Sequence, residues 1–277
     1  MKRTQFLGLI TRILLWSLLI GLTVIVFYPL LWMVGNGFKT NAELFGNPFA
    51  LPIDWKWSNY VDAWNQGVSN YMVTSVLVTV TSTLTTVFIS AWAAYGLTRV
   101  TIPFNRFWTG LILGGLMLAP PVALVPLVRM FQALGLYDTF WALMILYTAF
   151  RVPFTTFLIR SYMIDLPAEV DEAAEVDGAS RWTIFWRIIL PMSTPIIISA
   201  VILHVLFAWN EYIFAMVFTS GSGVQTLPIG LTSLMSRFGT DFPVVFAGMV
   251  IAAVPVIVIF LISQRYFIKG VADGMGK

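Results

Sequence analysis

Six long apolar segments alternate with shorter polar segments along the chain. Each is about as long as the roughly 20 residues that an α-helix needs to cross a bilayer, where no water satisfies the backbone. The pattern predicts an all-α membrane protein with six transmembrane helices and one transmembrane domain over residues 1–277. The spans are expected at residues 13–34, 68–97, 107–128, 139–163, 195–218 and 244–263.

The composition supports a membrane protein and narrows the possible chemistry. Hydrophobic residues make up 58% of the chain and charged residues 10%, whereas about a quarter of the residues in a soluble domain are charged. The chain has no cysteine and one histidine. Disulfides, thiolate nucleophiles and most zinc sites are therefore excluded, and no metal site is expected.

The basic residues that flank the spans predict the orientation. Cytoplasmic loops of membrane proteins contain an excess of lysine and arginine. If the N-terminus is cytoplasmic, eleven of the 16 basic residues lie on that side, four lie outside and Arg151 lies within a span. Both termini are therefore expected in the cytoplasm. The bases are spread along the chain and not clustered, so no nucleic-acid partner is expected.

The segment between the fourth and fifth spans is acidic. Six acids and no base occur from Asp165 to Asp177. Pro167 suits the first turn of a helix, and the acids that follow it favour the positive end of the helix dipole. We predict a short helix from 167 to about 177, ended by Gly178 in the left-handed conformation. Ser180 is then expected to cap a second helix that begins at Arg181, and Pro191 and Pro195 are expected to interrupt the path into the fifth span.

The predicted helix has a stripe of mostly small side chains. Val170, Ala173, Ala174 and Asp177 recur at the spacing of one helix face. Small side chains let another surface approach closely, so the stripe suits a docking surface. The residues are equally compatible with an amphipathic connector that only solvates the cytoplasmic face.

Three sequence motifs resemble those of a known family. Residues 172–191 read EAAEVDGASRWTIFWRIILP, and the spacing of EAA, Gly178, Ile188 and Leu190 resembles the EAA loop of bacterial ABC importer permeases. WNEY at 209–212 and QRYFIKG at 264–270 are similar to signatures of binding-protein-dependent carbohydrate permeases, specifically the smaller maltose-type membrane subunit. The likeness covers nearly the whole chain, and the tail at 273–277 departs from the family pattern.

The resemblance implies a type I ABC importer permease fold in the bacterial inner membrane, with residues 165–191 as its cytoplasmic coupling-helix loop. The chain would form half of the translocation path for a sugar or oligosaccharide, within membrane lipids. The implied partners are a second homologous permease, two ATPase subunits and an extracytoplasmic solute-binding protein. The residues assigned to ATPase coupling are Glu172, Ala173, Ala174, Asp177 and Gly178.

No motif for catalysis is present in the chain. It contains no GxxxxGK[ST] phosphate loop, no HExxH and no GxSxG. The chain is therefore expected not to be an enzyme, to have no catalytic residue and to bind no cofactor. If transport is driven by ATP, a partner ATPase must use the ATP and magnesium.

Four polar residues within the predicted spans are candidates for the substrate path: Arg151, His204, Asn210 and Glu211. An isolated charge in a span costs about 2.5–3.5 kcal/mol on insertion scales, so we hypothesise an ion pair between Arg151 and Glu211. The pair is compatible with a role in helix packing and with a role along the path. His204 is expected to be a hydrogen-bonded interior residue.

Glycines mark two further places. Gly110 and Gly114 in the third span have the spacing of a close-packed helix contact, and prolines follow them. The outer loop at 219–243 contains Gly221 and Gly223. As sequence it indicates a flexible connector, and the resemblance implies contact with the solute-binding protein.

Three alternatives remain open at the level of sequence. The first is a permease of the same superfamily for a solute other than a sugar. The second is an ion-coupled secondary transporter that uses Arg151, His204 and Glu211 as a relay. The third is an assembly subunit without a transport path.

Overall fold

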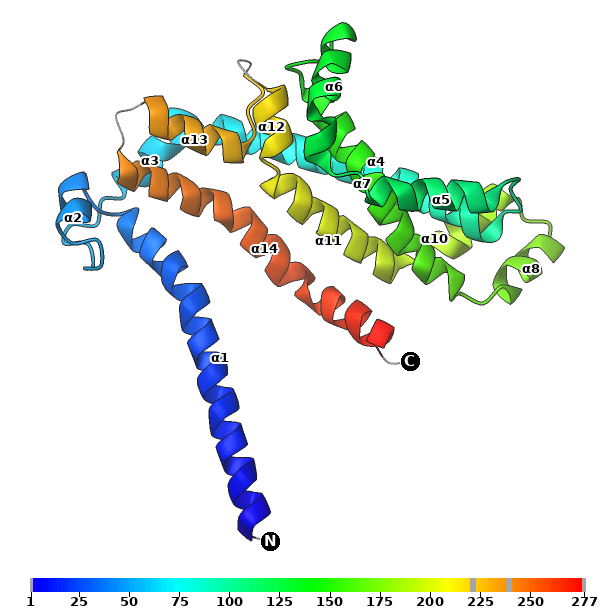
Figure 1. Cartoon of the computed structure of the whole chain (residues 1–277), viewed down its shortest axis with the longest axis horizontal. Coiled ribbons are helices and arrows are strands. Elements are labelled where there is room, and N and C mark those ends of the chain that lie inside the picture. The colour runs from blue at the N-terminus through cyan, green and yellow to red at the C-terminus, as the bar shows by residue number, and fades with distance from the viewer. Residues whose placement is uncertain (1, 220–222, 238–240, 276–277) are drawn as a thin grey trace. The chain divides into compact units, whose positions relative to one another are not determined.

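In the computed structural model, the described residues form helices joined by turns and loops, and none of them forms a strand (Figure 1). It describes residues 2–219, 223–237 and 241–275, and the side chains of residues 11–219, 223–235 and 241–264. The first half contains α1 (Lys2–Asn36), α2 (Asn41–Gly46), α3 (Ser58–Ala63), the π-helical turn η1 (Trp64–Val68), α4 (Ser69–Arg99), α5 (Asn105–Leu116) and α6 (Pro120–Ala133). The second half contains α7 (Phe140–Ile164), α8 (Glu169–Val176), α9 (Arg181–Ile184), the π-helical turn η2 (Phe185–Ile189), α10 (Leu190–Met192), α11 (Thr194–Asn210), α12 (Ile213–Phe218), α13 (Leu227–Arg237) and α14 (Phe242–Met275).

Four helical segments are long and apolar enough to cross a membrane. They are Thr11–Asn36, Ser58–Arg99, Phe140–Ile164 and Phe242–Gln264. Two more spans are obtained if each of two bent helix pairs crosses as one unit, the first bent by 99° and the second by 77°. The described residues therefore hold four to six candidate spans. The first bent pair overlaps the third predicted span, and α11 of the second pair overlaps the fifth.

The third predicted span is not one straight helix. Instead, α5 ends at Leu116 and α6 begins at Pro120, with a bend of 99° between them. Proline has no amide hydrogen, so it fits the first turn of a helix, where that hydrogen has no intrahelical acceptor. Pro120 and Pro121 therefore start a new helix within the segment that the apolar pattern assigned to one span.

The fifth predicted span is also interrupted. The helix α11 ends at Asn210, and Glu211 is extended, with φ −69° and ψ 125°. The chain becomes helical again in α12, from Ile213 to Phe218. The apolar pattern over 195–218 did not reveal this break, because apolar residues continue through it.

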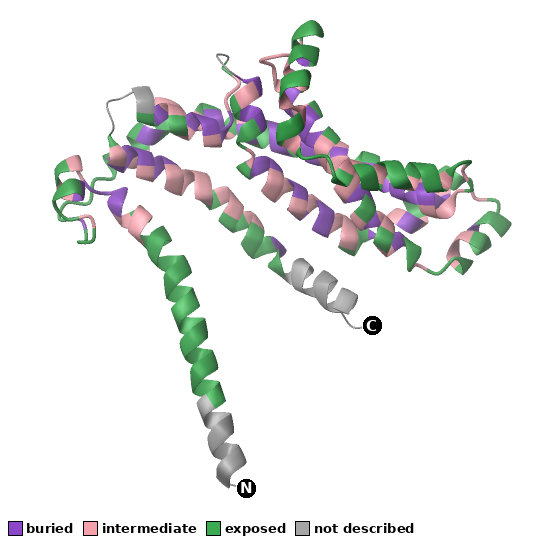
Figure 2. Ribbon diagram, in the orientation of Figure 1, coloured by how far each residue is buried: buried purple, intermediate pink, exposed green. Residues whose placement is uncertain are grey.

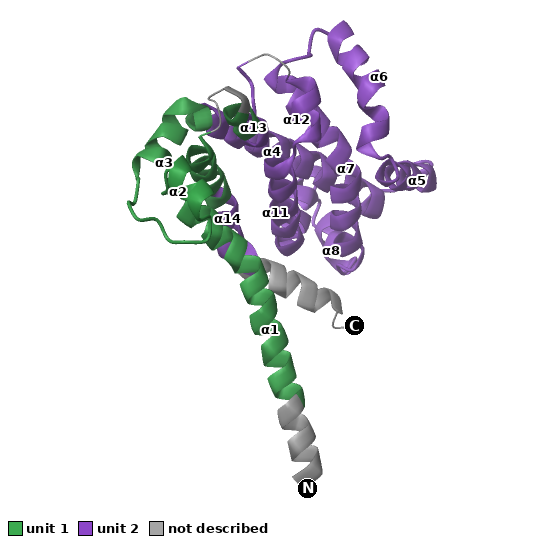
Figure 3. Ribbon diagram, turned by 60° about the vertical axis from the view of Figure 1, so that its left-hand side comes forward, with its two compact units in different colours: residues 1–69, 231–254 green, residues 70–230, 255–277 purple. Residues whose placement is uncertain are grey.

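The chain forms two compact units, which Figure 3 colours separately. The first comprises residues 1–69 and 231–254, and the second comprises residues 70–230 and 255–277. In the first unit, the side chains of α1 from Thr11 to Leu31 are exposed almost throughout (Figure 2), as suits a helix that faces lipid. The prediction of one transmembrane domain stays a prediction.

The loop that follows α1 in the first unit is built around Phe38. This side chain is buried, and the rings of Trp55, Trp57 and Tyr60 lie 4.7–5.0 Å from it between centroids. The two tryptophans remain more than half exposed. These aromatic residues therefore pack the loop, and the exposed rings remain suited to the headgroup level of a bilayer.

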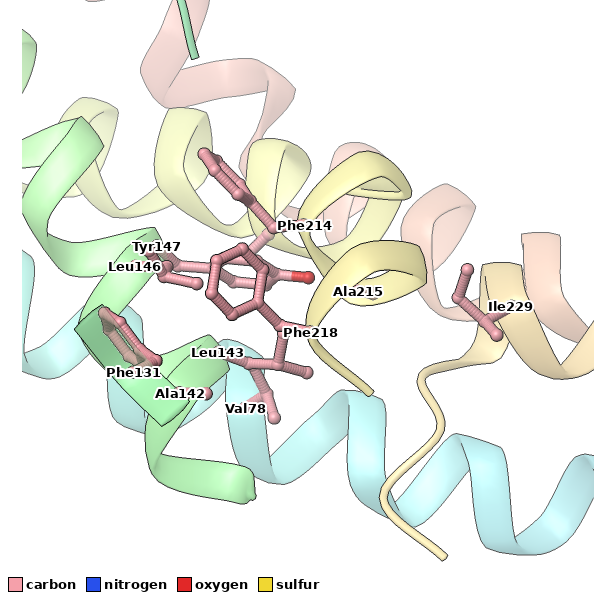
Figure 4. Packing of buried hydrophobic residues seen from close by; sticks show 11 residues of the cluster. Val78, Phe131, Ala142, Leu143, Leu146, Tyr147, Phe214, Ala215, Phe218 and Ile229 are labelled. Atoms are coloured by element: carbon pink, nitrogen blue, oxygen red, sulfur yellow. The ribbon is translucent and has the colours of Figure 1, made fainter. Parts of the chain in front are cut away.

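The second unit contains two hydrophobic clusters. In the first, Tyr147 and Leu143 of α7 pack with Phe214 and Phe218 of α12 and with Phe131 of α6 (Figure 4). The second cluster joins the end of α4 to α7, α8, α9 and η2. Its buried members are Ala91, Ala94, Tyr95, Ile159, Met163, Ala174, Ile184, Phe185, Ile189 and Ala200. This second cluster holds the acidic loop against the spans.

Candidate functional site

The acidic loop forms the helix and turn that the sequence predicts. The helix α8 runs from Glu169 to Val176, with acids in its first turn. Gly178 has φ +78°, and its amide donates to the carbonyl oxygen of Glu175 at 3.0 Å. This is the left-handed ending that a glycine accommodates without strain.

The second short helix begins where the capping pattern indicates. The Ser180 hydroxyl accepts a hydrogen bond from the Thr183 amide at 3.2 Å, and α9 starts at Arg181. The helix then passes through the π-helical turn η2 and ends in α10 at Met192. A bend of 77° separates it from α11, and Pro191 and Pro195 lie on either side of the bend. The predicted interruption before the fifth span is confirmed.

The stripe of small side chains is not a single outward surface. Ala174 is only 8% exposed and packs in the second hydrophobic cluster, whereas Ala173 and Asp177 are exposed. Within this chain Ala174 therefore packs inward and Ala173 is open to another surface, and contact of both alanines with a partner stays a prediction. Successive helical residues point about 100° apart, so adjacent alanines need not share an environment. Ala174 allows α8 to approach α7 and α9 closely.

The outward face of α8 combines acidic and apolar groups. Glu172 and Ala173 are exposed, and Val176, one turn after Glu172, is 87% exposed. A valine so exposed on an acidic helix is available to an apolar contact with another molecule. Val176 was not among the predicted contact residues, although its spacing of four from Glu172 places both on one face.

Two ion pairs connect α8 to the rest of the second unit. Arg99 Nη1 lies 3.3 Å from Asp171 Oδ2, with both side chains mostly buried, and Arg181 Nη2 lies 3.2 Å from Glu175 Oε1, with both half exposed. Burial raises the pKa of the Asp171 carboxyl above its usual value, and the positive charge of Arg99 opposes this shift. From the sequence alone, both arginines indicate only the orientation of the chain, and their partners on α8 become visible in the structure.

Arg151 and Glu211 do not form the hypothesised ion pair. Glu211 accepts hydrogen bonds from the Tyr147 hydroxyl at 2.9 Å and from the amides of Phe214 and Ala215 at 2.9 and 3.1 Å. Glu211 lies between the end of α11 and the start of α12. Its carboxylate therefore caps α12, because it accepts two amides of the first turn of that helix. The guanidinium of Arg151 instead lies against two aromatic rings: its central carbon is 4.7 Å from the ring centroids of Phe154 and Phe207.

The other two polar candidates in the spans form hydrogen bonds within the chain. His204 is fully buried, and its Nε2 lies 3.2 Å from the Ser82 hydroxyl. Asn210 donates to the carbonyl oxygen of Leu206 at 2.8 Å and is exposed. His204 thus has the hydrogen-bonded interior position that we expected. A role of these residues along a substrate path stays a prediction.

The segment at 219–243, which is predicted to lie outside, contains a helix where the sequence indicated only a flexible connector. The helix α13 begins at Leu227, whose amide donates to the Ser75 hydroxyl at 2.7 Å. Pro228 favours the start of a helix at Leu227, because proline fits the first turn of a helix. Gly223 is exposed just before α13, and Gly221 lies outside the described residues.

Comparison with known proteins gives one family and several relatives. The family model described as binding-protein-dependent transport system inner membrane component matches residues 9–273. The chain is 46% identical to the probable ABC transporter permease protein YurM of Bacillus subtilis (strain 168), over 95% of this chain and 87% of the relative. It is 33% identical to the diacetylchitobiose uptake system permease protein NgcG of Streptomyces coelicolor, over 93% of this chain and 86% of the relative.

One solved structure has the same fold. It is the crystal structure of a bacterial ABC transporter involved in the import of the acidic polysaccharide alginate, and the chain that matches is 23% identical to this one. The match has a TM-score of 0.81 and covers 91% of this chain and 94% of that chain. The helical fold of this chain is therefore that of the matching chain of this transporter.

Proposed function

Because this chain belongs to the family of binding-protein-dependent transport system inner membrane components, we propose that it forms half of the translocation path of an ABC importer for a sugar or oligosaccharide. The relative that takes up diacetylchitobiose, which aligns over 93% of this chain, supports a saccharide as the cargo. The aromatic residues, with 22 Phe, 11 Trp and 9 Tyr, are compatible with sugar binding.

In this proposal, α8 is the element that docks on a separate ATPase. The docking proposal rests on one observation, which is that α8 has two different faces. Ala174 and Asp171 fix one face to the chain's own spans, and the opposite face exposes Glu172, Ala173 and Val176. A partner with basic groups around a small apolar hollow would complement that face.

The remaining assignments follow from the same proposal. The chain binds no cofactor, and the partner ATPase uses ATP and magnesium. The complex contains this chain, a second homologous permease, two ATPase subunits and an extracytoplasmic solute-binding protein. The helix α8 and both termini lie in the cytoplasm, and the outer segment that contains Gly223 faces the binding protein. Gly178 supplies the turn that ends the docking helix.

Mass spectrometry of the proteins that copurify with the chain from its native membrane in mild detergent tests the docking proposal. We expect stoichiometric ATPase and homologous permease subunits, with the ATPase lost in Glu172→Lys. Asp54→Lys makes the same change of charge at an exposed position of the outer loop and should keep the ATPase. A chain that purifies alone and moves solute in liposomes without ATP would instead be an ion-coupled carrier.

Uptake into proteoliposomes tests the cargo. The assay uses the purified complex, its binding protein, ATP inside the liposomes and radiolabelled diacetylchitobiose, maltose, glutamine or phosphate as the probe. We expect ATP-dependent uptake of a saccharide and none of glutamine or phosphate. Uptake of glutamine or phosphate with no uptake of either saccharide would reject the sugar assignment and keep the importer.

A further inference from the structure

Arg99 lies where three helices of the second unit meet. It is the last residue of α4, and its side chain is 9% exposed. Its Nη2 donates to the carbonyl oxygens of Met163 at 2.8 Å and Leu166 at 2.6 Å, at the end of α7. Its Nη1 lies 3.3 Å from Asp171 Oδ2, in the first turn of α8. One guanidinium therefore contacts both α7 and α8 from the end of α4.

The chemistry of Arg99 suits a fixed joint between these helices. A guanidinium holds its donors in a rigid planar fork, and the carbonyls at a helix C-terminus favour a cation. Removing one partner of a buried ion pair strongly destabilises the arrangement. Close to the pair, Ala174 packs with Met163 and Ile184 in the second hydrophobic cluster. Ionic and apolar contacts thus hold the same face of α8.

The neighbouring ion pair provides a contrast. Arg181 and Glu175 are as close as Arg99 and Asp171, at 3.2 Å, but their side chains are 52% and 48% exposed. Exposed pairs contribute little, because water screens them and their side chains lose entropy on pairing. Of the two ion pairs, the buried one between Arg99 and Asp171 is therefore the one able to transmit a force from α8 to α4.

We propose that Arg99 is a positioning residue for transport, which ties α8 to the cytoplasmic ends of α4 and α7 so that the three helices move as one body. This inference rests on the proposed function, in which an ATPase displaces α8. Without these contacts of Arg99, α8 would rotate about the short connections before Glu169 and after Val176, and its displacement would not move the spans.

The absence of cysteine from the chain makes a direct test possible. Ala149→Cys on α7 and Glu169→Cys on α8 are exposed positions for two spin labels. Pulsed electron paramagnetic resonance of the complex then gives the distance distribution between the labels, with and without ATP and magnesium. With Arg99 intact, we expect one narrow maximum at the same distance in both conditions.

The variants separate a tie from a general role in folding. Arg99→Gln should lose the single narrow maximum and acquire a dependence on ATP, while the ATPase still copurifies because the outward face of α8 is unchanged. Arg99→Lys, which retains the charge, should recover much of the narrow distribution. Glu175→Gln, which removes only the exposed pair, should leave the distribution unchanged. Asp171→Asn provides the same comparison if Arg99→Gln does not fold.

A distribution in Arg99→Gln as narrow as in the parent would overturn the proposal, as would equal broadening in Glu175→Gln. A parent whose distance already changes with ATP would overturn it too. A parent complex that contains no ATPase would instead contradict the proposed function. In that case the distributions measured without nucleotide still decide whether Arg99 holds α8 to α7.

Discussion

The hydroxyl of Tyr147 donates a hydrogen bond of 2.9 Å to the carboxylate of Glu211. Tyr147 is fully buried in the cluster of Figure 4, and Glu211 lies at the break between α11 and α12. The same carboxylate accepts the amides of Phe214 and Ala215. A single acidic side chain therefore starts α12 and fastens it to α7.

Removing the Tyr147 hydroxyl should destabilise the protein measurably. We expect Tyr147→Phe to lower the free energy of unfolding by about 1.5–3 kcal/mol, because the acceptor is charged. Tyr137→Phe is the matched control, since Tyr137 donates to the neutral carbonyl oxygen of Val217 at 3.1 Å, and it should cost about 0.5–1.5 kcal/mol. Denaturant unfolding in detergent, followed by tryptophan fluorescence, measures both. Equal losses in the two variants would contradict a charged acceptor at Glu211.

The two alanines of the EAA motif should respond differently to enlargement. Ala174→Leu adds volume to a packed cluster and should cost about 1–3 kcal/mol of stability. Ala173→Leu changes an exposed site, so its stability should stay within about 0.5 kcal/mol, while its larger side chain weakens copurification of the ATPase. Thermal unfolding and copurification measure the two effects. A stable Ala174→Leu that fails to bind the ATPase would show that Ala174 faces the partner.

The glycines of the third predicted span should also differ in their tolerance of a side chain. A Cβ on Gly115 would lie 2.8 Å from the Pro153 ring, whereas a Cβ on Gly110 or Gly114 meets nothing within 4 Å. Within this chain, the close contact is therefore at Gly115 and not at the two glycines that the sequence singled out. Gly115→Ala should cost about 1–3 kcal/mol by overpacking. Gly114→Ala should gain up to about 1 kcal/mol from helix propensity, and thermal unfolding distinguishes the two. A loss in Gly114→Ala would indicate a close contact that Gly114 makes outside this chain.

Asp171 should make stability depend on pH in the acidic range. Its pKa in the folded chain is raised above the ordinary 3.8, so the folded state retains the proton to a higher pH than the unfolded state does. The contribution of this group to stability is complete below about pH 3.8 and is lost as the pH rises through the raised pKa. The free energy of unfolding of the parent should therefore fall with rising pH relative to Asp171→Asn. A difference that is constant with pH would contradict the shift.

Local sequence was enough to predict several parts of the candidate site. The left-handed Gly178, the Ser180 cap and the break around Pro191 and Pro195 all depend on residues within a few positions of each other. Such features follow from backbone sterics and from the unpaired groups at helix ends, so they are readable without knowing the fold. The helical membrane class likewise followed from the length of the apolar segments.

Tertiary structure decided which side of each element faces inward. Hydrophobicity alone did not distinguish Ala173 from Ala174, because their environments depend on α7 and α9 packing against one of them. The partners of the Arg99 side chain, and the Tyr147 hydroxyl that binds Glu211, lie more than 60 residues away in the chain, so no local pattern indicated them. The sequence by itself determined the helical class and the ends of the helices in the acidic loop, because these depend on the length of apolar segments and on neighbouring residues. Only the folded chain determined which charges are buried together, because burial depends on contacts between distant segments.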